Sequence, residues 1–150
     1  MLLKEKISND LIVAMKSGDV VRRDTLRMVD SMIHNAEIEK KKKEEGLNDT
    51  EVIEILSRAV KQRKDSVEQY EKGGRQDLAE KEKQEIEIIS AYLPEQLGED
   101  KIREIIKEVI TQTGATSKAD MGKVMGQAMG KLKGQADGNA VKRIVEEELS

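Results

Sequence analysis

The chain has 150 residues, of which 38% are charged and 37% hydrophobic, and its formal net charge is −3. It contains no Cys, Phe or Trp, and only two Tyr and one Pro. Strand-rich domains depend on aromatic and β-branched residues and on frequent turns, so this composition predicts an all-α protein. Without Cys there is no disulfide, thiol nucleophile or thiolate metal site. No apolar run approaches the roughly 18 residues that span a bilayer, and we expect a cytoplasmic protein without a membrane segment.

Apolar residues at spacings of three and four predict four helices before the single proline. Asn48 and Glu51 form a capping-box pattern at the start of the third of these helices. The glycine pair at 73–74 ends it. The expected helices are one with an apolar face from Leu3 to Met15 that ends at Ser17–Asp19, one from Val20 to Glu45, one from Asn48 or Asp49 past Tyr70, and one that includes Leu78 to Leu93.

Pro94 marks a domain boundary because proline forces the residue before it out of helical geometry. A fifth helix is expected over Ile102–Ile110, a sixth after the weak capping signal of Ser117 and Asp120, and a seventh after Asp137. The sequence therefore predicts two helical bundles. Residues 1–93 would form a four-helix N-terminal bundle and residues 94–150 a smaller three-helix bundle.

Glycine recurs at a strict four-residue spacing from Gly122 to Gly138. On a helix, residues four apart lie on one face, and each glycine costs about 1 kcal/mol relative to alanine. Two explanations follow from this pattern. The glycines serve tight helix packing or helix ends within the small bundle, or they let another backbone, of protein or nucleic acid, approach closely.

The residues offer little support for catalysis or metal binding. His34 is the only histidine and shares a helix face with Asp30 and Glu37. A specific metal site needs a complete and fixed ligand set, so we expect no metal and no catalytic residue. No phosphate-binding glycine loop of the Walker or dinucleotide type is present, so we expect no cofactor.

A local basic segment is a better candidate for binding. Between Gly114 and Val145 there are six basic side chains and two acidic ones, a net charge of +4. Basic side chains beside accessible glycines suit a phosphodiester backbone, although a solvated basic face is the commoner meaning of such a segment. The candidate nucleic-acid-binding residues are Lys118, Lys123, Lys131, Lys133, Lys142, Arg143, Gly126, Gly134 and Gly138.

Several motifs resemble those of the YqeY-like family, which shares a domain with the C-terminal part of the B subunit of the tRNA-dependent amidotransferase. The resemblance covers nearly the whole chain. The motifs are R-x-T-L-R ending at Arg27, residues 61–66, 74–82, Glu85-Ile86, Tyr92-Leu93-Pro94, residues 120–125 and 133–138, and Val141.

The resemblance implies four helices followed by three, and a role beside tRNA without an active site of its own. It implies tRNA, and an aminoacyl-tRNA synthetase or amidotransferase subunits, as partners, and neither a membrane nor DNA. We expect a non-catalytic tRNA-associated accessory module. The alternatives are participation with partner subunits in carbon–nitrogen ligase chemistry that uses glutamine as amido donor, and a helical interaction scaffold that binds no RNA.

Four polar residues in these motifs fall near the expected inner faces of the first bundle: Arg27, Arg63, Glu82 and Glu85. They have two interpretations, a half-buried salt-bridge network that fixes helix register and a contact surface for a partner.

Overall fold

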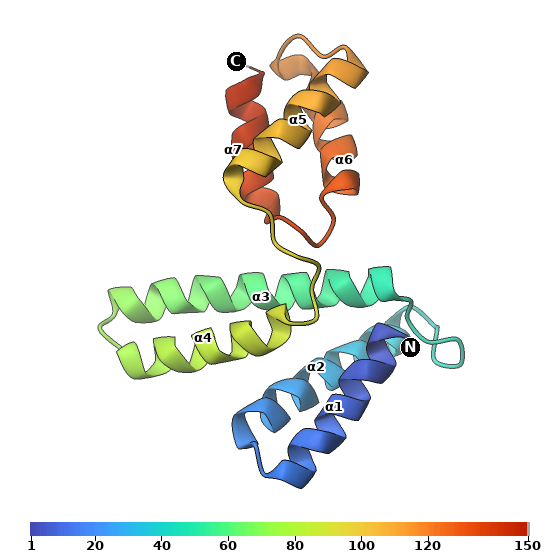
Figure 1. Ribbon diagram of the computed structural model, residues 1–150, viewed down its shortest axis with the longest axis vertical. Coiled ribbons are helices and arrows are strands. Elements are labelled where there is room, and N and C mark those ends of the chain that lie inside the picture. Colours follow the sequence, from blue (N-terminus) through green and yellow to red (C-terminus); the bar gives the residue numbers. More distant parts are fainter. Residues whose placement is uncertain (150) are drawn as a thin grey trace. The chain divides into compact units, whose positions relative to one another are not determined.

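Helices make up all of the regular secondary structure that the computed structural model describes, which is residues 1–149 (Figure 1). The prediction of an all-α fold is confirmed. The helices are α1 (Leu3–Ser17), α2 (Val20–Glu39), α3 (Asp49–Lys72), α4 (Gln76–Ser90), α5 (Glu99–Thr113), α6 (Met121–Lys131) and α7 (Gly138–Glu148), with a short 3-10 helix at Lys118–Asp120 before α6.

Asn48 and Asp137 begin their helices as predicted, whereas Asp120, at the start of α6, makes no side-chain cap hydrogen bond to that helix. The Asn48 side chain accepts a hydrogen bond from the Glu51 amide at 2.9 Å, and the Glu51 carboxylate accepts one from the Asn48 amide at 3.2 Å. Asp137 accepts from the Asn139 amide at 3.0 Å at the start of α7. These bonds satisfy amides that have no partner within the first turn of a helix.

The second helix ends at Glu39, six residues before the predicted end at Glu45. Lys41 adopts the left-handed conformation, with φ +57°, and the Lys42 amide donates to the Glu37 carbonyl at 2.8 Å. This turn closes the helix and starts a loop that brings Leu47 into the core, where it is 2% exposed. Burial of Leu47 therefore outweighs the helical propensity of the lysine and glutamate run.

Residues 1–93 form one compact unit. It consists of two helix pairs, α1 with α2 and α3 with α4, each joined by a short connection at one end in Figure 1. Fully buried aliphatic side chains from all four helices meet in one core. They include Ile7, Leu26, Ile33, Leu56 and Ile89.

The salt-bridge interpretation holds for Arg63 and Glu85 and fails for Arg27. Arg63 Nε donates to Glu85 Oε2 at 3.1 Å, and Arg63 Nη1 donates to the Ala59 carbonyl at 2.9 Å. Both side chains of this ion pair are largely buried. Glu82 is half-buried, and burial raises its pKa, with the nearby Glu85 charge adding to the effect. Arg27 is exposed.

A polar cluster ties the segment after α4 to the first two helices. The Tyr92 hydroxyl donates to Asp10 Oδ2 at 2.6 Å, and Arg22 Nη2 donates to the same hydroxyl at 3.4 Å. Lys6 pairs with Asp10 at 3.3 Å and lies 5.5 Å from the centre of the Tyr92 ring. The Tyr92 hydrogen bond holds the pKa of Asp10 below its usual range, so the cluster stabilises the unit while Asp10 is ionised.

Replacement of Tyr92 by Phe should lower the free energy of unfolding of residues 1–93 by about 1–2 kcal/mol at pH 7, because it removes a hydrogen bond to a charged acceptor. The folded pKa of Asp10 is lowered, so this contribution is present above the ordinary Asp value of 3.8 and is lost as the pH falls through the folded pKa. Urea titrations at pH 7 and pH 3 measure it. The half-buried Tyr70 serves as control, since Tyr70→Phe removes no hydrogen bond to Asp10. An equal loss from both substitutions would contradict the assignment.

Residues 94–150 form the second compact unit, in which α5, α6 and α7 all contact one another. Its core includes the fully buried Ile106, Val124, Leu132 and Ile144. The segment before α5 belongs to this unit because the Leu97 amide donates to the Gln135 carbonyl at 2.9 Å. The chain therefore has two separate aliphatic cores.

We predict that the two units fold independently when they are expressed as residues 1–93 and 94–150. Each unit encloses its own core, so each fragment should unfold cooperatively and keep its helical circular dichroism. In the full chain, protease Glu-C should cut after Glu95, which is exposed and lies outside the helices, as do Glu44 and Glu45 in the loop between α2 and α3. A first cut within Val52–Tyr70, or an unfolded fragment, would contradict the prediction.

Candidate nucleic-acid interface

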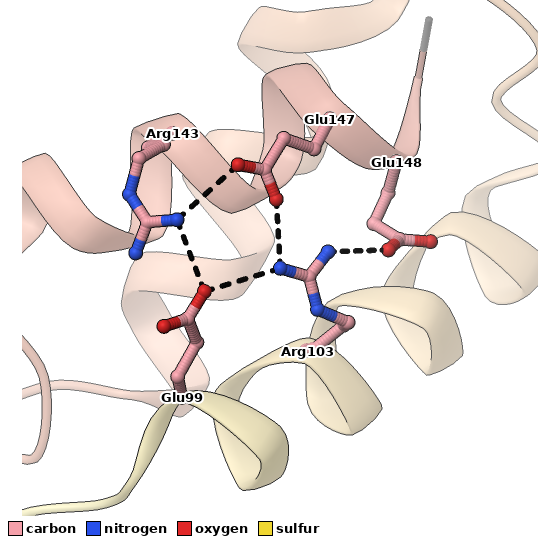
Figure 2. A network of polar contacts seen from close by, with 5 residues as sticks. All are labelled: Glu99, Arg103, Arg143, Glu147 and Glu148. Carbon is pink, nitrogen blue, oxygen red and sulfur yellow. Dashed lines mark hydrogen bonds and ion pairs between the residues drawn. The ribbon is translucent and has the colours of Figure 1, made fainter.

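Two arginines join the first turn of α5 to the last turns of α7 in the second unit (Figure 2). Arg103 contacts Glu148 and Glu147 at 2.7 Å each and Glu99 at 3.2 Å. Arg143 contacts Glu99 at 3.0 Å and Glu147 at 3.2 Å. Hydrogen bonds from Arg143 lower the pKa of Glu99, and those from Arg103 lower the pKa of Glu147. These side chains are partly exposed, so each pair contributes modestly to stability.

This network bears on Arg143, one of the predicted phosphate contacts. Its guanidinium already meets two carboxylates, one of them on a helix 44 residues earlier in the chain. An anionic ligand would have to displace those carboxylates before Arg143 could bind it. The structure therefore gives Arg143 a clear role in holding α7 against α5.

The glycines of α6 lie on its exposed side. A Cβ atom added at Gly122, Gly126 or Gly130 would meet no atom within 4 Å. The opposite side of the helix carries the buried Val124 and Ala128. Tight packing within this bundle, one of the two explanations of the glycine period, is therefore wrong for these three glycines.

The last two glycines of the period serve the ends of helices. Gly134 follows α6 in the left-handed conformation, with φ +75°, which glycine adopts without strain. Gly138 is the first residue of α7, and a Cβ atom there would lie 3.7 Å from Met129 Cε. The helix-end explanation is right for this pair, and the structure separates both from the exposed side of α6.

We define the α6 glycine face as Gly122, Lys123, Gly126 and Gly130. Lys123 is exposed, and helical spacing places it beside the glycines, one residue after Gly122 and three before Gly126. Only Lys123 and Gly126 of this face were among the candidate residues. Gly122 and Gly130 belong to the same four-residue glycine period as Gly126, so the sequence pattern could have identified them as part of this face.

The other candidate lysines lie elsewhere on the second unit, and they differ in how far their charges are already paired. Lys118, in the 3-10 helix, and Lys142, on α7, are exposed and form no ion pair among residues 1–149. Lys131 donates to Gln112 at 3.0 Å and lies 3.8 Å from Glu108. Lys133 is exposed and follows the end of α6. Three lysines, at 118, 123 and 142, are therefore the most available to an anionic ligand.

The α6 glycine face combines a surface without side chains, which another backbone can approach closely, with the positive charge of Lys123. The amides inside a helix are already bonded to its own carbonyls, so the glycines offer space rather than donors. Lysine supplies a point charge suited to phosphate. The face can therefore seat a phosphodiester backbone without reading its bases.

The first unit does not assemble the conceivable metal ligands. His34 Nδ1 lies 2.8 Å from the Asp30 carbonyl oxygen, whereas Glu37 is buried and bonded to Lys4 at 2.6 Å. Within residues 1–149, no three His, Cys, Asp or Glu side chains are grouped to hold a metal ion. In the same part of the chain, no helix is long and apolar enough to cross a membrane.

Replacement of Gly126 or Gly130 by Ala should raise the free energy of unfolding of the second unit by about 0.5–1 kcal/mol each, because alanine favours the helix and its methyl group meets open space. Gly114 provides the control. It too has open space around it, but its φ of +69° disfavours alanine, so Gly114→Ala should destabilise the unit. Thermal denaturation of residues 94–150 measures all three, and a loss of stability at Gly126 would restore the packing explanation.

Comparison with known proteins identifies relatives along most of the chain. A family model described as "Yqey-like protein" matches residues 4–149. Altered inheritance of mitochondria protein 41, mitochondrial, from Lachancea thermotolerans is 40% identical over 87 residues, which are 58% of this chain and 46% of that protein. The protein of the same name from Candida glabrata is 37% identical over 89 residues, 59% of this chain and 48% of the relative. The matched region thus spans about half the length of these curated relatives.

These relatives also correct one expectation and support another. Their names describe mitochondrial proteins, which contradicts the cytoplasmic location expected from the lack of Cys and of a membrane segment. Composition could not reveal this, because a cysteine-free helical chain suits more than one compartment. The resemblance seen in the sequence motifs is confirmed over nearly the full length, and the chain belongs to the YqeY-like protein family.

Proposed function

We propose that this protein is a non-catalytic accessory module that associates with tRNA through its second unit. The observation that carries the proposal is the α6 glycine face: three exposed glycines that weaken a helix without any gain in packing, next to an available lysine. A feature that costs stability and is not needed for the fold suggests an external contact.

The chemistry of the face favours the backbone of a nucleic acid over its bases. Recognition of single-stranded bases uses aromatic platforms, and both tyrosines of the chain, Tyr70 and Tyr92, lie in the first unit. Folded RNA is recognised largely by shape and by its sugars and phosphates. A glycine surface that carries an exposed lysine suits that mode, and tRNA is the folded RNA that the family resemblance implies.

The net charge of −3 limits this binding to a local surface. A chain with this charge gains nothing from general attraction to polyanions, so affinity must come from local basic side chains, of which Lys118, Lys123 and Lys142 are the most available. The names of the curated relatives make mitochondria the compartment to examine first.

Replacement of Lys118, Lys123 and Lys142 by Ala should weaken binding to all tRNAs alike. It should also reduce the slope of log K against log salt by about 0.7–0.9 for each phosphate that the variant no longer neutralises. Filter binding or fluorescence anisotropy at several salt concentrations measures both. The matched control replaces three other exposed lysines, Lys43, Lys64 and Lys107, and should leave affinity and slope nearly unchanged.

A second variant separates the glycines from the charges. Gly126→Gln places a long side chain in open space, so the fold should persist while close approach of RNA is blocked. Unchanged tRNA affinity in both Gly126→Gln and the triple-lysine variant would remove this face as an RNA site. The scaffold that binds no RNA would then be the better account of the protein.

A further inference from the structure

Exposure of large hydrophobic side chains is confined to the first two helices and the residues that precede them. Among residues 1–149, the large hydrophobic side chains that are mostly open to solvent are Met1, Leu2, Ile12, Val13, Met15, Val20, Val21 and Ile38. None lies in α3, α4 or the second unit. Scattered exposed apolar residues need no explanation, whereas a concentration of them marks an interaction site.

Five of these exposed side chains belong to residues that flank the turn between α1 and α2 in the sequence. We define the apolar tip as Ile12, Val13, Met15, Val20 and Val21, which flank the Ser17–Asp19 turn within ten residues of sequence. Figure 1 shows this turn at the end of the α1–α2 pair that points away from α3. The neighbouring Ala14 is 2% exposed and faces the bundle. The side of α1 that faces the core is therefore a different one, and the tip residues of α1 face the solvent.

The border of the tip is basic. From Ile12 to Arg27 the chain carries four basic side chains and two acidic ones, a local charge of +2 in a protein of charge −3. Asp19 caps α2 through the Arg22 backbone amide at 3.2 Å, whereas the Arg22 side chain lies 3.9 Å from the carboxylate of Asp10, and Asp24 pairs with Arg23 at 2.9 Å.

The two remaining basic side chains of the border are uncompensated. Lys16 and Arg27 are exposed and have no ion pair among residues 1–149. Arg27 is the last residue of the R-x-T-L-R motif, of which the middle residues, Thr25 and Leu26, are buried. The motif thus leaves one arginine exposed on α2, seven residues after Val20 of the tip, and the proposed tRNA contact makes no use of it.

We propose that the apolar tip is a docking surface for a partner protein that presents an aliphatic helix face bordered by carboxylates. Aliphatic side chains such as Ile, Val and Met pack against a hydrophobic face, and the uncompensated cations select acidic neighbours and steer their approach. The proposal concerns the first unit and does not depend on RNA binding by the second.

The charges and the composition of the tip disfavour two other occupants. Lys16 and Arg27 of two copies would repel each other, which opposes self-association through this tip. Insertion into a lipid surface favours Trp, Phe and Leu on the apolar side, and the tip has none of these.

Titration of the full-length protein with two designed peptides tests the proposal. The first is an 18-residue amphipathic helix with Leu on one face and Glu on the other, and the second carries Lys in place of every Glu. The acidic peptide should bind with amide chemical-shift changes concentrated in residues 12–27. Replacement of both Ile12 and Val13 by Gln should weaken that binding at least about tenfold, as loss of a central apolar anchor does.

The chain offers a control for each element of the surface. Ile38 is as exposed as Val13 but lies at the other end of α2, so Ile38→Gln should leave the affinity unchanged. Replacement of both Lys16 and Arg27 by Gln should reduce the ratio of the affinity for the acidic peptide to the affinity for the basic peptide. All of these positions are exposed, and circular dichroism should show an unchanged fold.

Several results would overturn the proposal. They are equal binding of the two peptides, no binding of either, chemical shifts outside residues 12–27, and an affinity that survives the Ile12 and Val13 replacements. Dimerisation that depends on Ile12 and Val13, seen by analytical ultracentrifugation, would assign the tip to a second copy. Sedimentation with phosphatidylserine vesicles that depends on the same residues would assign it to a membrane surface.

Discussion

Burial of aliphatic side chains along one side of each helix is the constraint on which both units depend. With no Phe or Trp and with Tyr92 the only aromatic residue in either core, the cores consist almost entirely of Ile, Leu, Val and Ala. A fully buried Leu, Ile or Val contributes about 1.5–3 kcal/mol, and each unit has few of them. Helix register and helix ends therefore matter more here than in a protein with large aromatic anchors, because a misplaced turn removes a large part of a small core.

Polar contacts in this protein fix where the helices end and how they are held. The Tyr92–Asp10 bond fastens the segment after α4 to α1, and the arginines of Figure 2 fasten α7 to α5. These contacts join residues that are 82 and 44 positions apart. They also restrict the helix pairs to one arrangement, which aliphatic packing alone specifies less well.

Local sequence predicted the helices well wherever a local signal ended them. Gly18 adopts positive φ within the predicted stop at Ser17–Asp19, and Asn48 caps α3 as expected. The predicted end of α2 was wrong because the position of that end depends on the burial of Leu47, which is a tertiary contact. For the candidate site, the glycine period was visible in the sequence, but the open space beside Gly126 and the carboxylates around Arg143 depend on where distant helices lie.

The two proposed surfaces differ in chemistry, and this difference constrains what the chain can do. The α6 glycine face works through charge and close approach, so salt should weaken it strongly. The apolar tip works mainly through burial of aliphatic area, which salt affects little, with charge acting on selectivity and rate of association. Each surface lies on a unit with its own core, so a ligand on one need not perturb the fold of the other. Together, the two proposals describe a chain that holds an RNA on one unit and an acidic protein on the other.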